Sequence, residues 1–211
     1  PDDAFSVVPY HKGFLFLKMI EREMVDEQKF LEFAQAYFER FKFKTITTDN
    51  FVTFLLGWLP PTFQRQKLYE WIDGEDLPAN APKLECPEYD LVKGLAKDGK
   101  TDPGATGWLP MMLALYCADA VVPTPPHVMQ WLTEVGADVH CNTEVRVAYM
   151  ILCLKNRQAE ILPKVLEFAE EVGRRKYVRP LLHIAAKVSD AAQATVHQWL
   201  ANNEPSLHPV T

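Results

Sequence analysis

The sequence has few cysteines, no long apolar run and no excess of positive charge. No apolar stretch approaches the ~20 residues of a membrane-spanning helix, and the first residues do not have the pattern of a signal peptide, so none is expected. The four cysteines include no C-x-x-C pair, and a chain of 211 residues does not need disulfide bonds to be stable. These absences predict a cytoplasmic protein with reduced thiols and no membrane partner.

The charge balance excludes another class of partner. The chain carries 22 basic and 28 acidic side chains, for a net charge of −6, whereas a general nucleic-acid binder needs a basic face to neutralise phosphates. Hydrophobic residues make up 48% of the chain, which excludes intrinsic disorder. The composition is typical of a folded globular protein without a nucleic-acid partner.

Familiar catalytic and metal-binding motifs are also missing. None of the six histidines stands in H-E-x-x-H or four residues from another, the spacing that a zinc pair on a helix needs. Neither the nucleophile motif G-x-S-x-G nor a glycine-rich phosphate loop occurs. We therefore expect no metal site and no bound cofactor in this chain.

The apolar residues that are present recur at helical spacing. Strict two-residue alternation is absent, so the sequence predicts an all-α fold. Residues 1–58 contain aromatic-rich helices, and residues 59–104 form a proline-rich linker. Short helical segments over residues 105–211 predict a stack of antiparallel α-helices resembling a solenoid, because each segment is too short to be stable alone.

Two segments carry candidate functional groups. Residues 173–180 place four cations within six positions, and Gly173 is suited to end the preceding helix in the left-handed conformation. These cations either compensate the negative end of that helix or anchor an anionic ligand such as a carboxylate. In the second segment, Pro9 holds Tyr10 near the start of a helix, where its hydroxyl is either structural or a donor to a developing oxyanion.

Several segments resemble, in the same order, motifs of one enzyme family. They are VPYHKGF at 8–14, YFERF at 37–41, TITTD at 45–49, LP at 77–78, GRRKYVRPL at 173–181 and SLHPVT at 206–211. On these residues the chain resembles the M1 zinc aminopeptidases, and within them the leukotriene A4 hydrolase branch. Residues 84–150 are only weakly alike.

The resemblance implies a division of labour. Family members carry a G-x-x-E-N motif and a zinc motif, H-E-x-x-H with a downstream glutamate, and neither occurs here. The chain is similar to the C-terminal part of such an enzyme: the last helices of the catalytic domain, a linker, and an armadillo- or HEAT-like α-α superhelix. The chain is expected to be inactive alone, because the zinc of the complete enzyme would be held by the rest of the catalytic domain. That zinc-bearing domain is therefore an expected partner of this chain.

The family's site residues transfer to four positions. Tyr10 matches the tyrosine that stabilises the tetrahedral oxyanion, and Arg174 and Lys176 match the pair that binds the substrate's free carboxylate. Asp2 matches an aspartate that directs water in hydrolysis of a fatty-acid epoxide. This chain has Phe5 where the branch has a tyrosine, and His11 where the branch has a glutamate. Both differences favour short peptides over the epoxide as substrates.

Other classes of function remain open on the sequence. The helical stack could be a scaffold whose basic segment binds acidic peptides, or it could only wall off a catalytic cleft. If these helices pack against a further domain, an exposed apolar patch is also expected where that domain would cover them.

Overall fold

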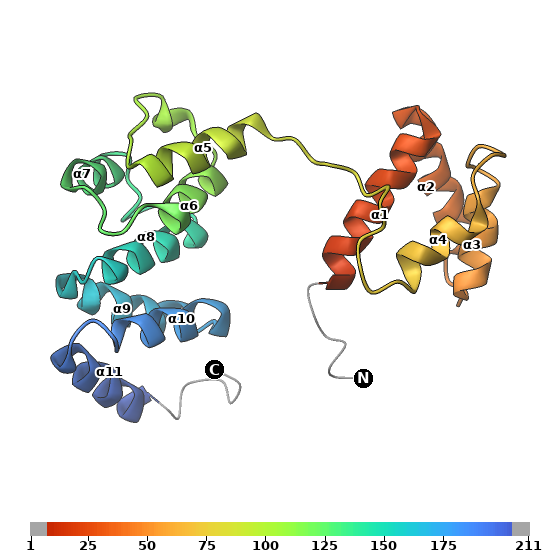
Figure 1. Ribbon diagram of the computed structural model, residues 1–211. Helices are drawn as coiled ribbons and strands as arrows, with labels where there is room; N and C mark the ends of the chain where they lie inside the picture. Colours follow the sequence, from red (N-terminus) through yellow and green to blue (C-terminus); the bar gives the residue numbers. More distant parts are fainter. Residues whose placement is uncertain (1–7, 204–211) are drawn as a thin grey trace. The chain divides into compact units, whose positions relative to one another are not determined.

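A computed structural model describes residues 8–203 of the chain. All regular secondary structure between these residues is helical, with no strand, which confirms the predicted all-α class. The chain divides into two compact units, Pro1–Glu85 and Cys86–Thr211 (Figure 1). No helix within the described residues is long and apolar enough to span a membrane.

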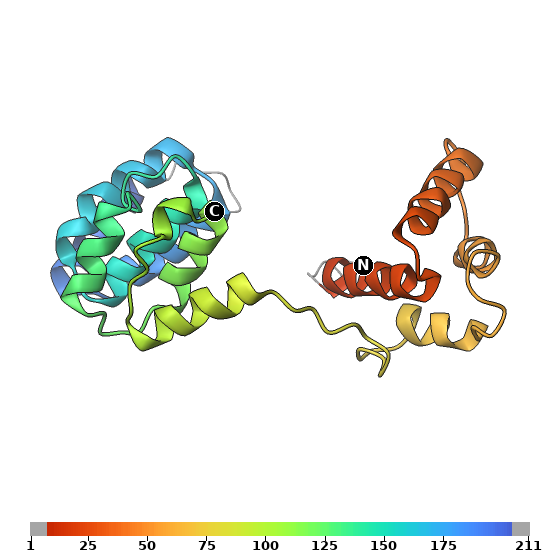
Figure 2. The ribbon, with the colours of Figure 1, turned by 90° about the horizontal axis from the view of Figure 1, so that it is seen from above.

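The first unit contains four helices in its described part. They are α1 (Val8–Met24), α2 (Glu27–Phe41), α3 (Thr48–Leu56) and α4 (Arg65–Ile72). Helix α1 packs against α2 across a two-residue connection, and α3 packs against α4 (Figure 2). Their shared core is formed by Met19, Ile20, Met24, Phe33, Val52, Leu55, Leu59, Leu68 and Trp71.

Side chains at the first turns determine where α2 and α3 begin. Asp26 accepts a hydrogen bond from the backbone N–H of Gln28 at 2.9 Å, which satisfies a free donor of α2. At α3, Thr47 Oγ1 accepts from the Asn50 N–H at 3.2 Å, while Asn50 Oδ1 accepts from the Thr47 N–H at 3.1 Å. This reciprocal pair is a capping box, so Thr47 caps α3.

One face of α1 is apolar and exposed. Tyr10, Phe14 and Leu17 follow one another at i, i+4 and i+7, and their exposed fractions are 73%, 51% and 44%. The next residue of the stripe, Ile20, is fully buried. No other described element encloses the N-terminal half of this stripe. We call Tyr10, Phe14 and Leu17 the α1 apolar face.

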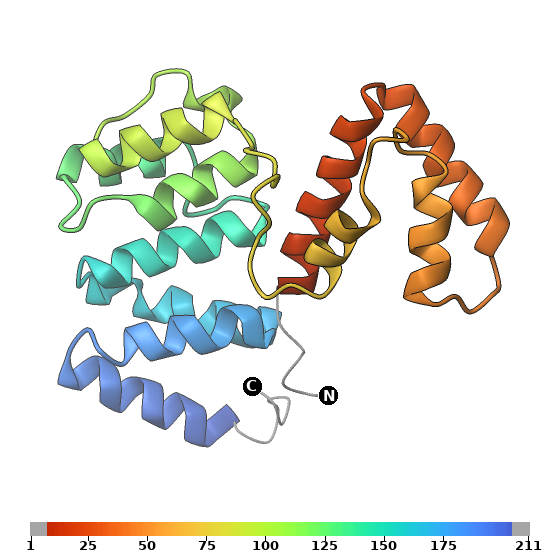
Figure 3. The ribbon, with the colours of Figure 1, turned by 45° about the vertical axis from the view of Figure 1, so that its right-hand side comes forward.

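The second unit is a succession of short helices. They are α5 (Pro87–Asp98), η2 (Ala105–Gly107), α6 (Pro110–Asp119), α7 (Pro126–Glu134), α8 (Thr143–Lys155), η3 (Ala159–Ile161), α9 (Leu162–Val172), α10 (Arg175–Ala185) and α11 (Asp190–Asn203). Figure 3 shows most of them stacked in chain order. Helix α6 packs against α5 and α8, α8 packs against α10, and α10 also contacts α9 and α11.

Helix α8 lies at the centre of this stack. Seven of its residues are buried: Val145, Val147, Tyr149, Met150, Leu152, Cys153 and Leu154. Because these residues lie on several faces of the helix, α8 is enclosed by its neighbours rather than lying on one side of a core. The contacts between successive helices agree with the expected helical stack, while a superhelical repeat of armadillo or HEAT type stays a prediction.

The range 59–104, expected as a linker, contains two helices. Helix α4 belongs to the first unit and α5 to the second, and the units are divided after Glu85. Pro87 is the first residue of α5, a position where the missing N–H costs no hydrogen bond. Proline therefore begins a helix in this range instead of preventing one.

The four cysteine thiols are free. Cys86 and Cys141 are exposed, whereas Cys117 and Cys153 lie in the core of the second unit. Burial raises the pKa of the Cys117 thiol to about 12 and that of Cys153 to about 11. Both buried thiols are protonated at neutral pH, so neither is an activated nucleophile.

Candidate functional site

The cationic segment predicted from the sequence forms the start of α10. Gly173 ends α9 with φ +57°, the left-handed conformation expected for it. Arg174 is the N-cap of α10, and its backbone is extended. Arg174, Arg175 and Lys176 therefore follow the negative end of α9 but also lie at the positive end of α10, where cations are unfavourable and anions are favoured. Dipole compensation alone does not account for this placement.

Two of these cations lie on one buried aromatic ring. The guanidinium of Arg174 is 5.5 Å from the ring centroid of Tyr177, and the Lys176 ammonium is 5.2 Å from it. Tyr177 is only 7% exposed, whereas Arg174 and Lys176 are exposed. The buried ring supports both cations at the surface, an arrangement in which cation–π attraction helps to orient the charged groups.

A carboxylate from α8 completes this cluster. Lys176 Nζ and the Tyr177 hydroxyl both donate to Glu144 Oε1, the latter at 2.9 Å. Arg174, in contrast, forms no salt bridge with any residue that the structure describes. We call Glu144, Arg174, Lys176 and Tyr177 the α8–α10 charge cluster.

The electrostatics of the cluster keep its charges in place at neutral pH. The pKa of Glu144 is lowered, mainly by the hydrogen bond from Lys176 and further by the bond from Tyr177 and the nearby charges. The pKa of Lys176 is raised, mainly by its hydrogen bond to Glu144. Glu144 therefore stays ionised and Lys176 protonated. The charge of Arg174 also acts on Glu144, but Arg174 is the cation of this cluster that forms no salt bridge among the described residues.

Sequence analysis singled out Arg174 and Lys176 but missed Glu144 and Tyr177 as members of the site. Glu144 lies 32 residues before Lys176, and no local pattern connects them. Tyr177 follows the cations directly in the sequence, but only its burial shows that it supports them. A search for acidic residues in the first turns of other helices would have included Glu144.

Tyr10 belongs to the first unit. It lies in the first turn of α1, one residue after Pro9, as predicted. Within residues 8–203 its hydroxyl has no hydrogen-bond partner, and its side chain is exposed on the α1 apolar face. Asp2, Phe5 and the segment 206–211 lie outside the described residues.

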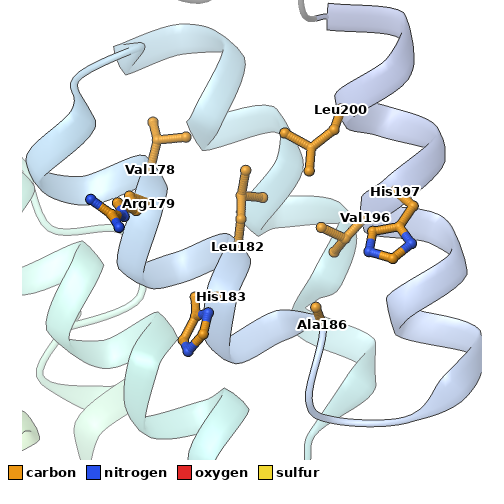
Figure 4. Close-up of a pocket in the computed structure, with 8 residues that line it drawn as sticks. All are labelled: Val178, Arg179, Leu182, His183, Ala186, Val196, His197 and Leu200. Carbon is orange, nitrogen blue, oxygen red and sulfur yellow. The ribbon is translucent and has the colours of Figure 1, made fainter. Parts of the chain in front are cut away.

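The second unit also has a groove that is separate from the charge cluster. It lies between α10 and α11 and has a volume of roughly 290 Å³ (Figure 4). Arg179, His183 and His197 supply its polar lining, and Lys187 Nζ is 2.7 Å from His183 Nε2. The remaining lining residues are apolar: Val178, Leu182, Ala186, Val196 and Leu200.

A zinc site does not emerge from the described part of the chain. Between residues 8 and 203, no three histidine, cysteine or acidic side chains gather closely enough to hold a metal ion. A protein zinc site needs at least three such ligands. The described residues therefore do not fit a zinc ion, and no chemical step is assigned through one.

Comparison with known proteins shows which families this chain is similar to. The family model described as "Leukotriene A4 hydrolase, C-terminal" matches residues 112–211, and the model "Peptidase family M1 domain" matches residues 1–67. These matches confirm the resemblance to the M1 peptidases and to the leukotriene A4 hydrolase branch.

Two curated relatives are similar along nearly the whole chain. Leukotriene A-4 hydrolase of Xenopus laevis is 28% identical over 229 residues, covering 100% of this chain and 37% of that protein. Aminopeptidase B of Homo sapiens is 27% identical over 232 residues, covering 99% of this chain and 35% of that protein. The chain thus spans about a third of the length of the curated relatives that it matches.

Proposed function

We propose that this chain forms the substrate-anchoring part of an M1-type aminopeptidase that acts on short peptides with a free carboxylate. In this proposal Arg174 and Lys176 bind that carboxylate, and Tyr10 donates a hydrogen bond to the oxyanion formed as the peptide bond is attacked. The observation that carries the proposal is the exposed guanidinium of Arg174, which lies over the buried Tyr177 ring and has no salt bridge among the described residues.

The α1 apolar face supports the same proposal. A contiguous apolar surface that includes an aromatic hydroxyl is typical of a buried interface or a substrate cleft. We propose that a zinc-bearing domain covers Phe14 and Leu17 and leaves the Tyr10 hydroxyl available to substrate. Zinc is then a cofactor of the larger enzyme, which we propose to be cytoplasmic. An epoxide hydrolase activity would depend on Asp2.

The division of labour is tested by comparing this 211-residue chain with a longer form that includes the H-E-x-x-H motif. We expect the longer form to bind one zinc ion per chain and to release amino acids from tripeptides. We expect the 211-residue chain to bind no zinc and to show no turnover above the buffer rate, because it lacks the groups that would activate water. Metal analysis and a peptide-release assay measure both properties, and turnover by the 211-residue chain would contradict the proposal.

A second candidate function is favoured by the groove between α10 and α11. Its apolar floor and its basic side chains complement an amphipathic acidic peptide, so the helical stack would act as a binding scaffold. For such a peptide we expect Arg179→Glu to weaken binding about 10-fold or more, by placing like charges together. Arg175→Glu is the matched control, because Arg175 lies on the same helix but does not line the groove. If Arg179→Glu and Arg175→Glu weaken binding equally in a calorimetric titration, the attraction is non-specific and the groove is not the binding site.

A further inference from the structure

The cationic site at the start of α10 already holds a carboxylate of the protein itself. Glu144 Oε1 accepts hydrogen bonds from both Lys176 and Tyr177. The side chain of Glu144 is 39% exposed and that of Lys176 is 56% exposed, so a ligand that reaches these cations also meets the Glu144 charge. A carboxylate ligand held by these cations would therefore lie close to the negative charge of Glu144.

Two helices bring Glu144 to this position. Asn142 caps α8 by accepting the backbone N–H of Glu144 at 2.9 Å, which places Glu144 in the first turn. A carboxylate is favoured in the first turn of a helix because the free N–H groups there carry partial positive charge. Since α8 packs directly against α10, this carboxylate faces the cations that begin α10.

The two cations, Arg174 and Lys176, differ in their contacts. Lys176 donates to Glu144, so its charge is largely compensated within the protein. Arg174 keeps its guanidinium over the Tyr177 ring and forms no salt bridge in the described part of the chain, although its charge acts on Glu144. An incoming carboxylate is thus attracted by Arg174 and repelled by Glu144, while Lys176 interacts with both carboxylates.

We propose that Glu144 is the resident counter-ion of the carboxylate-binding site: it positions Lys176 and weakens the binding of ligand carboxylates, so that Arg174 determines their recognition. This inference rests on the proposed function of Arg174 and Lys176. Its physical consequence is that the site binds carboxylates reversibly and with limited affinity. Removing the negative charge of Glu144 without removing its hydrogen-bond acceptor strengthens carboxylate binding.

The substitution Glu144→Gln makes this change, because glutamine has the same length and keeps a side-chain oxygen that can accept from Lys176 and Tyr177. We expect Glu144→Gln to bind a tripeptide with a free carboxylate about 3- to 10-fold more tightly, the effect of removing one like charge several ångströms away near the surface. Binding of the C-terminal amide of the same tripeptide should not change. The 211-residue chain is titrated with both peptides, and calorimetry and the Nε–H resonance of Arg174 report binding.

Two further variants separate the possible causes. Glu134→Gln removes the same charge from α7, where Glu134 accepts a hydrogen bond from Gln130 at 2.8 Å, and it should leave the affinity unchanged. Arg174→Ala should abolish the preference for the acid over the amide. Thermal unfolding of each variant shows whether the fold is retained.

The outcomes distinguish the counter-ion role from the proposed function itself. If the unaltered chain prefers the acid and Glu144→Gln binds it equally well or more weakly, Glu144 is not an opposing counter-ion, while the carboxylate anchor remains. If neither the unaltered chain nor Glu144→Gln distinguishes acid from amide, the anchor fails and the counter-ion role fails with it. The inference is supported if Glu144→Gln binds the acid more tightly than the unaltered chain does, with no change for the amide, while Glu134→Gln does not.

Discussion

Replacing Tyr10 by phenylalanine, in a form of the protein that includes the zinc motif, is expected to lower kcat for tripeptides by about 10²- to 10³-fold. This is the usual cost of removing one hydrogen-bond donor to an oxyanion. KM should stay nearly normal, because the bond strengthens only as negative charge develops on the carbonyl oxygen. Steady-state kinetics with a tripeptide substrate measure both constants.

The structure supplies a matched control for Tyr10→Phe. Tyr37 on α2 belongs to the same compact unit, and its ring packs among other aromatic rings. Tyr37→Phe removes a hydroxyl without touching the α1 apolar face, so kcat should be unaffected. An unchanged kcat in Tyr10→Phe would remove Tyr10 from the mechanism and leave it with a role in packing only.

Replacing Arg174 by alanine is expected to lower kcat/KM for a tripeptide with a free carboxylate by about 10- to 150-fold. This range corresponds to the loss of one hydrogen bond between charged groups, about 1.5–3 kcal/mol. The same tripeptide with a C-terminal amide should be cleaved at almost the normal rate, because it has no charge for Arg174 to bind. The ratio of the two kcat/KM values is therefore the quantity to measure.

Arg175→Ala is the control for Arg174→Ala. Arg175 is the next residue and is also exposed, but it forms no salt bridge or ring contact within residues 8–203. Arg175→Ala removes the same amount of charge from the same helix end, and it should change kcat/KM for both substrates by less than about twofold. Equal losses for acid and amide in Arg174→Ala would show that the residue supports the fold and does not bind the carboxylate.

Much of the fold follows from local patterns in the sequence. Apolar spacing of three and four residues predicted helices on both sides of residues 59–104, because burial of one face is what makes short helices stable. Gly173 was expected to end α9, since glycine adopts positive φ without a steric penalty. The helices within residues 59–104 were harder to anticipate, because proline prevents a helix in its interior but is well accommodated at the first position, as at Pro87.

Less of the candidate site than of the fold could be predicted from the sequence. Arg174 and Lys176 were identified from the sequence, by the density of charge and by family resemblance. Glu144 and Tyr177 join them only through the packing of α8 on α10 and through burial of the tyrosine ring. No sequence pattern specifies such a contact, because its two partners are 33 residues apart and are brought together by the intervening helices.

By itself, the sequence determined that this protein is helical, that a helix begins near Tyr10 and another ends at Gly173, and which cations are candidates for binding a carboxylate. These properties depend on neighbouring residues, whose effects on backbone conformation and charge density act over one or two helical turns. Only the tertiary structure decided that Lys176 is paired with Glu144 while Arg174 is not, and that Tyr10 is exposed beside Phe14. Burial and ion pairing depend on which helices pack together, and that choice is made by the whole chain as it folds.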